Sequence, residues 1–278
     1  MKNFKTQSEL KSYLNSLNRE KVKVGLVPTM GALHQGHLSL IEASQKNCDL
    51  TIASIFVNPT QFNNPDDLLK YPKPIEKDME MLNEIGCDVL FHPDVDEMYQ
   101  KNEGWNYQVG FLNTVLEGAF RPGHYEGVTQ IVYKLFDLVK PDRAYFGQKD
   151  YQQFLVISQM NQDFKMGIEL KACPIVREND GLAMSSRNIH LNSQERKSAL
   201  TLYQSLKFVR DNYQELSLSE LLEKAQAFYQ KDRLLNLEYF KICDVNTLEE
   251  LNEKTATAIA LVACTVGQTR LIDNVILP

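Results

Sequence analysis

The sequence predicts an α/β domain built on a parallel sheet, followed by a smaller α+β domain. Short apolar runs alternate with helix-type spacing of apolar residues through 1–175, and this alternation is typical of a parallel sheet covered by helices. From residue 176 the order changes to helices first and strands afterwards, which indicates a separate α+β unit. We therefore expect one domain at 1–175 and a second at 176–278.

The strands and helices of the first domain follow from their periodicity. The expected strands are short apolar runs at 22–27, 50–57, 89–91, 144–146 and 168–175. The expected helices show the three-to-four-residue spacing at 8–17, 38–46, 78–85, 127–139 and 151–160. Ligands of parallel sheets bind beyond the carboxyl ends of the strands. Residues that directly follow these strands are therefore the first candidates for a site.

The second domain begins with two capped helices. Asn192 and Glu195 have the spacing of a capping box and predict a helix over 193–211. Ser217 and Glu220 repeat that spacing and predict a second helix, which ends near residue 231. Strand patterns follow at 237–245 and 258–266.

The composition is that of an ordinary globular enzyme. Of the 278 residues, 43% are hydrophobic and 24% are charged. The net charge of −6 argues against a large nucleic-acid-binding surface, which needs a basic face. No apolar run has the roughly 18 residues of a membrane-spanning helix. We expect small-molecule substrates as partners, and neither nucleic acid nor a membrane.

The N-terminus and the cysteines together favour a cytoplasmic location. The first residues read as an amphipathic helix and lack the apolar centre of a signal peptide. The cysteines are odd in number, and none lies in a C-x-x-C motif: Cys48, Cys87, Cys173, Cys243 and Cys264. We expect reduced thiols, neither disulfides nor a zinc site.

The most informative motif is His34-Gln35-Gly36-His37, which follows a strand and begins a helix. Two imidazoles three residues apart share one face of a helix. The unpaired backbone N–H groups and the dipole of a helix N-terminus favour a polyphosphate there. Gly36 allows close approach of a ligand, and the imidazoles can donate to phosphate oxygens as a leaving group gains charge. The alternative is one helix-capping and one core histidine.

Amide side chains follow the second strand. Asn58 and Gln61 flank a proline-fixed turn. Amides can donate to a carboxylate or accept from a hydroxyl without adding charge. An ordinary Asn-Pro turn is the alternative.

A basic, glycine-containing run precedes the helix 127–139. It reads R-P-G-H at 121–124. Such a run is either a lid over an anionic ligand or a plain surface loop, and the sequence does not separate these alternatives.

A later strand enters a helix through Gly147, which permits a tight turn, and Lys149, a point charge suited to phosphate. Asp150 can cap the helix or accept from a ribose hydroxyl. Gln152 and Gln153 fall on different sides of the first helical turn, so at most one of them faces a ligand. The alternative is a solvated helix start with a Lys149–Asp150 ion pair.

The segment between the two domains contains a third candidate phosphate contact. Met184-Ser185-Ser186-Arg187 offers two hydroxyls and a guanidinium in a row. Arg binds phosphate bidentately, so the run suits a polyphosphate held from the second domain. Ser-rich loops are common, and an ordinary loop is the alternative.

Five runs occur in order between Pro28 and Asn188, namely P-T-M-G-A-L-H-x-G-H, F-V-N-P-x-Q-F, R-P-G-H-Y-x-G-V, F-G-x-K-D-x-Q-Q and D-G-L-A-M-S-S-R-N. Together they closely resemble the pantoate–β-alanine ligase (pantothenate synthetase) family of the H-x-G-H nucleotidyltransferase superfamily. The stretch that carries them covers about two thirds of the chain. The resemblance implies a Rossmann-like first domain and a small second domain that closes over it.

The resemblance also implies roles for individual residues. The residues that would bind ATP are Met30, Gly31, Ala32, Leu33, His34, Gln35, Gly36, His37, Gly147, Gln148, Lys149, Asp150, Val176, Met184, Ser185, Ser186 and Arg187. Those that would act on the reacting phosphates are His34, His37, Lys149 and Arg187. Those that would hold pantoate are Gln61, Gln153 and Asn58.

Asp78 is the best match to a family acid near Mg²⁺. The stretch that precedes it departs from the family pattern, with Asn63 in place of the usual Gly and Lys73 in place of the usual Arg. The metal assignment therefore rests on fewer matching residues than the nucleotide assignment.

The activity implied by the resemblance is the ATP-dependent joining of (R)-pantoate to β-alanine. Pantoate would first form an enzyme-bound pantoyl-adenylate with release of pyrophosphate, and β-alanine would then displace AMP. ATP, as substrate, and Mg²⁺ are the implied cofactors, and a homodimer is the implied assembly. Two alternatives are another adenylyl-transferring enzyme of the superfamily and a non-catalytic nucleotide-binding regulator.

Overall fold

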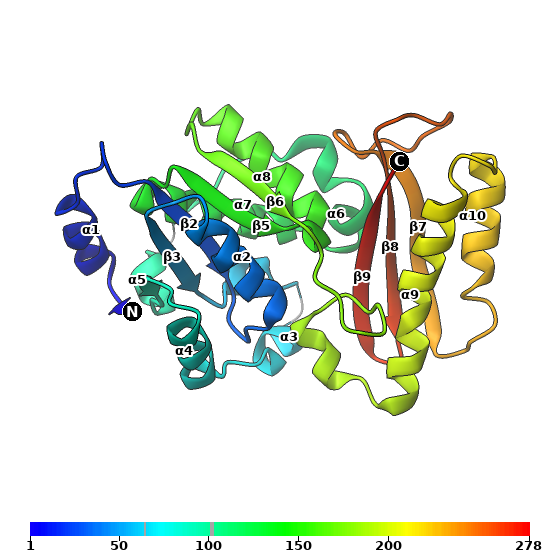
Figure 1. Cartoon of the computed structure of the whole chain (residues 1–278), viewed down its shortest axis with the longest axis horizontal. Coiled ribbons are helices and arrows are strands. Elements are labelled where there is room, and N and C mark those ends of the chain that lie inside the picture. Colours follow the sequence, from blue (N-terminus) through cyan, green and yellow to red (C-terminus); the bar gives the residue numbers. More distant parts are fainter. Residues whose placement is uncertain (64, 101–102) are drawn as a thin grey trace. The chain divides into compact units, whose positions relative to one another are not determined.

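The chain divides into two units, each built around its own sheet (Figure 1). The structure is a computed structural model that describes residues 1–63, 65–100 and 103–278. Unit 1 comprises Met1–Gly147 and Gln152–Cys173, and unit 2 comprises Gln148–Tyr151 and Pro174–Pro278. The turn after residue 147 therefore groups with the C-terminal unit, although a strand of unit 1 precedes it.

Unit 1 contains a parallel sheet with the order β1-β4-β3-β2-β5-β6. Its strands are β1 Lys2–Phe4, β2 Val24–Thr29, β3 Leu50–Ile55, β4 Val89–Phe91, β5 Arg143–Gly147 and β6 Glu169–Cys173. The strand order reverses between β2 and β5, which lie side by side with Gly25 opposite Arg143. Ligands of open parallel sheets bind at such a reversal, outside the carboxyl ends of the strands. The residues after β2 and β5 follow the two strands at that point.

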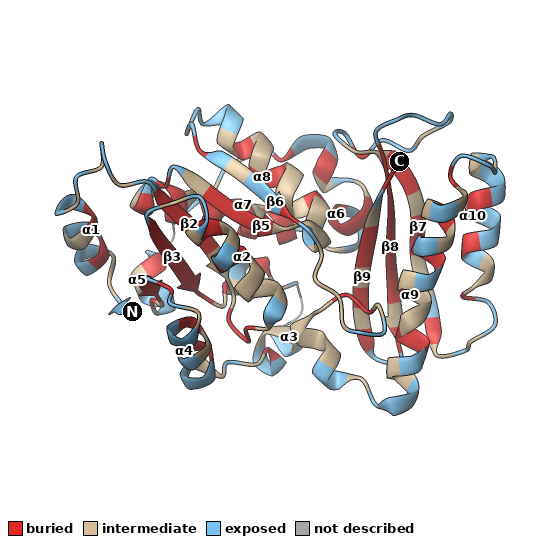
Figure 2. Ribbon diagram, viewed as in Figure 1, coloured by how far each residue is buried: buried red, intermediate tan, exposed pale blue. Residues whose placement is uncertain are grey.

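Helices and short 3₁₀ turns connect these strands. They are α1 Gln7–Asn15, α2 Gln35–Gln45, η1 Pro59–Gln61, α3 Pro65–Lys70, α4 Ile75–Glu84, α5 Val95–Met98, η2 Gly110–Asn113, α6 Leu116–Phe120, α7 His124–Val139 and α8 Tyr151–Asp163, preceded by the turn η3 Gln148–Asp150. On one face of the sheet, Val27 and Tyr145 share a core with Leu40 of α2 and Leu82 of α4. Strand β3 is buried over its whole length, as expected for a sheet that is covered on both faces (Figure 2).

Unit 2 contains an antiparallel sheet in the order β7-β8-β9, with α9 and α10 packed against it (Figure 1). Its elements are η4 Ser186–His190, α9 Ser193–Asn212, α10 Leu218–Ala227, β7 Leu235–Asp244, β8 Ala258–Val266 and β9 Thr269–Leu277. Leu202 and Leu206 of α9 share a core with Phe240 and Val262 of the sheet. Both predicted capping boxes are formed, at Asn192 and at Ser217.

The predicted fold class is confirmed: a parallel sheet with helices precedes a small α+β unit. Two strands, β1 and β9, were not predicted from the sequence. β1 has exposed polar residues at Lys2 and Asn3, and it forms because its backbone pairs with β4. β9 has the adjacent polar residues Asp273 and Asn274 at its centre, which interrupt the apolar pattern of a strand although both are buried.

All five cysteines are free thiols, and four of them are buried. This agrees with the expectation of reduced cysteines. Within the described residues, no helix combines the length and apolar character needed to cross a bilayer.

Candidate functional site

The two histidines of the H-x-G-H motif cap their own helix. His34 is the N-cap of α2, and its Nδ1 accepts from the backbone N–H of Gly36 at 3.1 Å. The backbone N–H of His34 donates to Nδ1 of His37 at 3.3 Å. Neither histidine is buried in the core, and their ring centroids lie 4.1 Å apart. The predicted pair therefore stands together at the helix N-terminus that follows β2.

The hydrogen bonds of these rings fix their tautomers. A backbone N–H can only donate, so Nδ1 of each ring is an acceptor. In a neutral imidazole the other nitrogen then carries the proton. The proton of a neutral His34 or His37 ring is therefore on Nε2.

The loop before the histidines is held by Asp78. Gly31 and Ala32 both have positive φ, at 78° and 49°, and a left-handed conformation is unfavourable for a residue with a Cβ, such as Ala32. The Asp78 carboxylate accepts from the backbone N–H groups of Ala32 and Leu33, each at 2.8 Å. Burial raises the pKa of this carboxyl, and the two amide bonds oppose that rise. Asp78 therefore compensates a strained turn that leads into the H-x-G-H motif.

Asp78 does not fit the predicted role of magnesium ligand. Its side chain is 1% exposed, and each carboxylate oxygen already accepts from a backbone amide. Magnesium retains several waters and needs an accessible oxygen. Elsewhere among residues 1–63, 65–100 and 103–278, no group of three or more His, Cys, Asp or Glu side chains could hold a metal ion.

Gln61 joins the ends of β2 and β3. It is the last residue of η1, the first element after β3, and its Nε2 donates to the Met30 sulfur at 2.8 Å. Met30 follows β2 and begins the segment predicted to bind the nucleotide. The predicted pantoate amide and the predicted nucleotide loop are therefore in direct contact.

Asn58 uses its whole side chain within the protein. Its Nδ2 donates to the Gln61 Oε1 at 3.2 Å and to the Gly127 carbonyl at 3.0 Å. Its Oδ1 accepts from the hydroxyls of Tyr99 at 2.6 Å and Thr60 at 3.1 Å. These four bonds fill the hydrogen-bonding capacity of a primary amide. Asn58 is therefore placed to hold Gln61, and it has no donor left for a ligand.

The R-P-G-H run is anchored to the same region. Helix α7 begins at His124, which is buried and whose Nδ1 lies 2.9 Å from the Gln61 carbonyl. A Cβ at Gly127 would meet the Thr60 carbonyl oxygen at 2.4 Å, so α7 approaches η1 more closely than any side chain would permit. Asn63, the departure from the family pattern, donates to the Pro122 carbonyl. The run is thus tied to the end of β3 at His124 and at Pro122.

The two adjacent glutamines of α8 are separated as the helical spacing predicted. Gln152 is buried, and it bonds the carbonyls of Leu112 and Val115 and the backbone N–H of Glu117. Gln153 is partly exposed. Of the two, Gln153 is therefore the one that can reach a ligand.

In unit 2, the turn η3 presents Lys149. The Lys149 Nζ lies 3.8 Å from Asp150, a long and weak ion pair, and the Lys149 side chain is 18% exposed. The strand-to-helix turn predicted from Gly147 onward is present, with Gly147 as the last residue of β5.

A hairpin-like turn in unit 2 brings together Val176 and the A-M-S-S-R run. The backbone N–H of Met184 donates to the Val176 carbonyl at 3.0 Å, and Arg177 bridges Ala183. Ser185 then caps η4 by accepting from the backbone N–H of Arg187 at 3.3 Å. The implied adenine contact and the implied phosphate contacts of this unit therefore lie in one folded segment.

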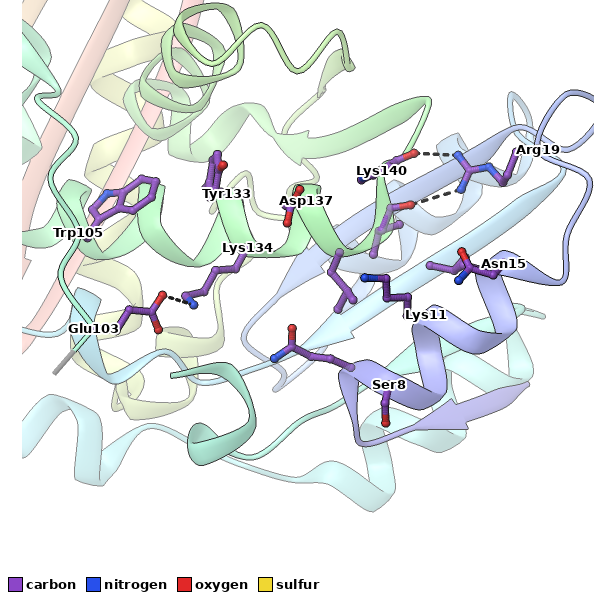
Figure 3. A pocket seen from close by; sticks show the side chains of 14 residues that line it. Ser8, Lys11, Asn15, Arg19, Glu103, Trp105, Tyr133, Lys134, Asp137 and Lys140 are labelled. Carbon is purple, nitrogen blue, oxygen red and sulfur yellow. Dashed lines mark hydrogen bonds and ion pairs between the residues drawn. The ribbon is translucent and has the colours of Figure 1, made fainter. Parts of the chain in front are cut away.

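A cavity of about 710 Å³ in unit 1 lies away from these residues, between α1 and α7 (Figure 3). Two of the cations that line it, Arg19 and Lys134, have partners within the protein. Arg19 donates to the carbonyls of Val139 and Lys140, and Lys134 pairs with Glu103. None of the predicted site residues lines it.

Comparison with known proteins identifies what the chain is similar to. A family model described as Pantoate-beta-alanine ligase matches residues 2–276. The chain is 45% identical over 277 residues to the pantothenate synthetase of Bacteroides fragilis, covering 99% of this chain and 98% of that protein. It is 44% identical over 279 residues to that of Thermotoga petrophila, covering both chains fully.

Solved structures give the same result. The pantothenate synthetase of Thermus thermophilus has a TM-score of 0.95 and 42% identity, with full coverage of both chains. The pantoate–β-alanine ligase of Francisella tularensis, in complex with β,γ ATP and β-alanine, has a TM-score of 0.83 and 36% identity, covering 99% of this chain and 97% of that one.

Proposed function

The chain belongs to the pantoate–β-alanine ligase family, and from that membership we infer that it is an AMP-forming ligase that joins pantoate to β-alanine at the expense of ATP. The family match extends over residues 2–276, so it includes both units. The H-x-G-H motif, the Gln61–Met30 contact and the hairpin of unit 2 are consistent with this activity.

The reaction needs activation of a carboxylate, because a free carboxylate is a poor acyl donor. A pantoate oxygen attacks the α-phosphorus of ATP, the bond to pyrophosphate breaks, and a pantoyl-adenylate forms. The amine of β-alanine then attacks the acyl carbon, and the bond to AMP breaks. The protein's tasks are to position two anions and to stabilise charge at phosphorus.

The contact between Gln61 and Met30 is the observation that carries the proposal. The attacking carboxylate and the α-phosphate must approach within about 3–3.5 Å. A pantoate held by Gln61 would lie beside the loop that leads into the H-x-G-H motif, since that loop begins at Met30, 2.8 Å from the Gln61 amide. We assign pantoate binding to Gln61 and Gln153, and we assign to Asn58 the holding of Gln61.

The histidine pair supplies hydrogen-bond donors for the phosphates. Because Nδ1 of each ring accepts from a backbone N–H, the ring proton of His34 and of His37 is carried by Nε2, and we assign these Nε2–H groups as the donors. Donors fixed before reaction stabilise developing charge without reorganisation. We assign to His37 the stabilisation of the departing pyrophosphate, and to His34 a contact to the phosphates.

Lys149 and Arg187 are the cations proposed for the phosphates. Lys149 provides a compact charge and Arg187 a bidentate one. Val176 is the proposed neighbour of adenine, and its bond to Met184 fixes it beside the segment that contains Ser185 and Arg187.

Magnesium is assigned to the substrate, as Mg·ATP. Asp78 does not fit the role of a metal ligand, because it is buried and its carboxylate already accepts from two backbone amides. Phosphate oxygens and water would hold the magnesium without a protein cage. The protein residues then act on the complex through hydrogen bonds and charge.

Neither alternative activity is favoured. Full-length relatives that are 44–45% identical to this chain are pantothenate synthetases. A homodimer and a cytoplasmic location are proposals that rest on the family resemblance and on the free thiols.

The direct test is to incubate the protein with ATP, pantoate and β-alanine and to follow AMP and pantothenate by mass spectrometry. Equal amounts of the two products should accumulate only when all three substrates are present. Formation of ADP in place of AMP, or no amide product, would reject the proposed function.

A further inference from the structure

A buried polar pair on β9 holds the turn that presents Lys149. Asp273 and Asn274 are 3% and 2% exposed at the centre of this strand. Burial of two adjacent polar side chains is unfavourable unless every donor and acceptor is bonded. Their partners therefore show what the pair does.

Asn274 bonds the backbone of η3 at two successive residues. Its Nδ2 donates to the carbonyls of Gln148 and Lys149, each at 2.9 Å. Its Oδ1 accepts from the Gln148 Nε2 at 3.2 Å. A side chain that donates twice and accepts once in this geometry must be a primary amide, since a carboxylate cannot donate and a serine hydroxyl donates once.

Asp273 extends the arrangement to the hairpin of unit 2. Its carboxylate accepts two bonds from the Arg177 guanidinium, at 2.6 and 2.9 Å, and one from the backbone N–H of Asn274 at 2.8 Å. Arg177 also donates to the Gly181 carbonyl at 3.1 Å. The segment that ends in Arg187 and the turn that contains Lys149 are thus attached to neighbouring residues of one strand.

We propose that Asn274 is a positioning residue for adenylation, which fixes the backbone of Lys149 and thereby the direction of its ammonium group toward the ATP phosphates. This inference rests on the proposed function of Lys149. An error of about 1 Å in the placement of a catalytic group can cost on the order of a hundredfold in rate. Asn274 therefore affects the reaction through Lys149, without touching substrate.

The test compares Asn274→Asp, which replaces the two donors by acceptors at constant size, with Asn274→Ser, which keeps one donor. Asn236→Asp is the matched control, because Asn236 is exposed on β7 of the same sheet. Each is measured in the wild-type and the Lys149→Ala background, with melting temperature, kcat, and KM for ATP and for pantoate.

The expected result is a fall in kcat/KM for ATP of about ten- to a hundredfold in Asn274→Asp, a smaller fall in Asn274→Ser, and no change in the control. The KM for pantoate should stay within about twofold. In the Lys149→Ala background, Asn274→Asp should lower kcat/KM for ATP little further, since the effects of two residues that act through one another are not additive. A purely structural role would instead lower kcat in proportion to the folded fraction and leave every KM unchanged.

Three other outcomes would overturn the inference, and they are distinguishable. If Lys149→Ala is costly and both Asn274 variants remain within twofold of wild type, Lys149 keeps its role and Asn274 loses its own. If Lys149→Ala itself stays near wild type, the proposed role of Lys149 fails, and the inference fails with it. Independent, additive losses would also reject it, because Asn274 would not act through Lys149.

Discussion

The backbone N–H of His34 donates to Nδ1 of His37 at 3.3 Å, and this bond makes Nδ1 the acceptor nitrogen of the His37 ring. The helix N-terminus thus gains a cap, and His37 gains a fixed Nε2–H donor. The tautomer of His37 therefore follows from its bond to the backbone of His34.

His37→Ala should slow adenylate formation far more than it weakens pantoate binding. Loss of one preorganised donor to a transition state costs about 2.7–4 kcal/mol, or roughly a hundred- to a thousandfold in rate. Single-turnover formation of pyrophosphate measures the step, and the pantoate concentration at half-maximal rate measures binding. Adenylation by the variant at near wild-type rate would remove His37 from the reaction.

Gln153→Ala should weaken discrimination for the hydroxyl groups of pantoate. An amide both donates and accepts, so a site built from Gln61 and Gln153 rejects analogues that lack a hydroxyl. In wild type, removal of the 2- or 4-hydroxyl of pantoate should lower kcat/KM for adenylation at least about tenfold. In Gln153→Ala, the ratio of kcat/KM for pantoate to kcat/KM for the dehydroxy analogue should be smaller.

The neighbouring Gln152 supplies the control for this prediction. Its three hydrogen bonds connect parts of unit 1, so Gln152→Ala should lower the melting temperature and leave discrimination unchanged. Equal discrimination by Gln153→Ala and wild type, with dehydroxy analogues as competing substrates, would place Gln153 outside the site.

Asp78→Asn should destabilise the protein and leave the magnesium dependence intact. The substitution places the amide NH2 group opposite one of the two backbone N–H groups, so that two donors meet and one hydrogen bond is lost. This costs about 1–3 kcal/mol of folding free energy. Because Asp78 holds Ala32 and Leu33, kcat/KM should also fall. The magnesium concentration for half-maximal activity, at fixed ATP, should match that of wild type.

Glu76→Gln is the control for Asp78, since it removes an exposed carboxylate from the same helix α4. It should change neither stability nor activity. A higher magnesium requirement in Asp78→Asn, with an unchanged melting temperature, would restore the metal-ligand assignment.

The buried thiols should make the fold less stable at alkaline pH. Burial raises the pKa of Cys87 to about 11 and that of Cys243 to about 12, in each case through desolvation. The ordinary thiol pKa of about 8.5 applies to the unfolded chain. Between that value and the folded value, the unfolded chain binds fewer protons, so stability falls as pH rises, by up to about 1.4 kcal/mol per pH unit for each thiol.

Urea unfolding at pH values from 8 to 10 measures this slope. Cys243→Ala should reduce the loss of stability with pH relative to wild type, whatever its effect at neutral pH. An identical slope in the two proteins would mean that Cys243 ionises in the folded state as readily as in the unfolded state.

The sequence predicted the candidate motifs better than the roles of their members. The His34–His37 pair, the capping boxes and the separation of Gln152 from Gln153 depend on local helical geometry, which spacing encodes. Asn58 has the same residue type as a ligand-binding amide, and only its four tertiary partners reveal that it is fully occupied.

Long-range pairing accounts for what the sequence did not reveal. Asp273 and Asn274 read as a polar interruption, because their partners Arg177 and Gln148 lie 96 and 126 residues away in the sequence. The turn that contains Lys149 groups with unit 2 for the same reason, since Asn274 holds its carbonyls. β1 forms because its backbone pairs with β4, and its side chains show no strand pattern that would predict it.

The central claim, attack of the pantoate carboxylate on the α-phosphorus of ATP, is tested most directly by isotope transfer. Pantoate labelled with ¹⁸O in both carboxylate oxygens is incubated with ATP, β-alanine and the protein, and the products are separated by mass. The account predicts that AMP gains one labelled oxygen, that pantothenate keeps the other in its amide carbonyl, and that pyrophosphate gains none. Unlabelled AMP, or label in pyrophosphate, would contradict it.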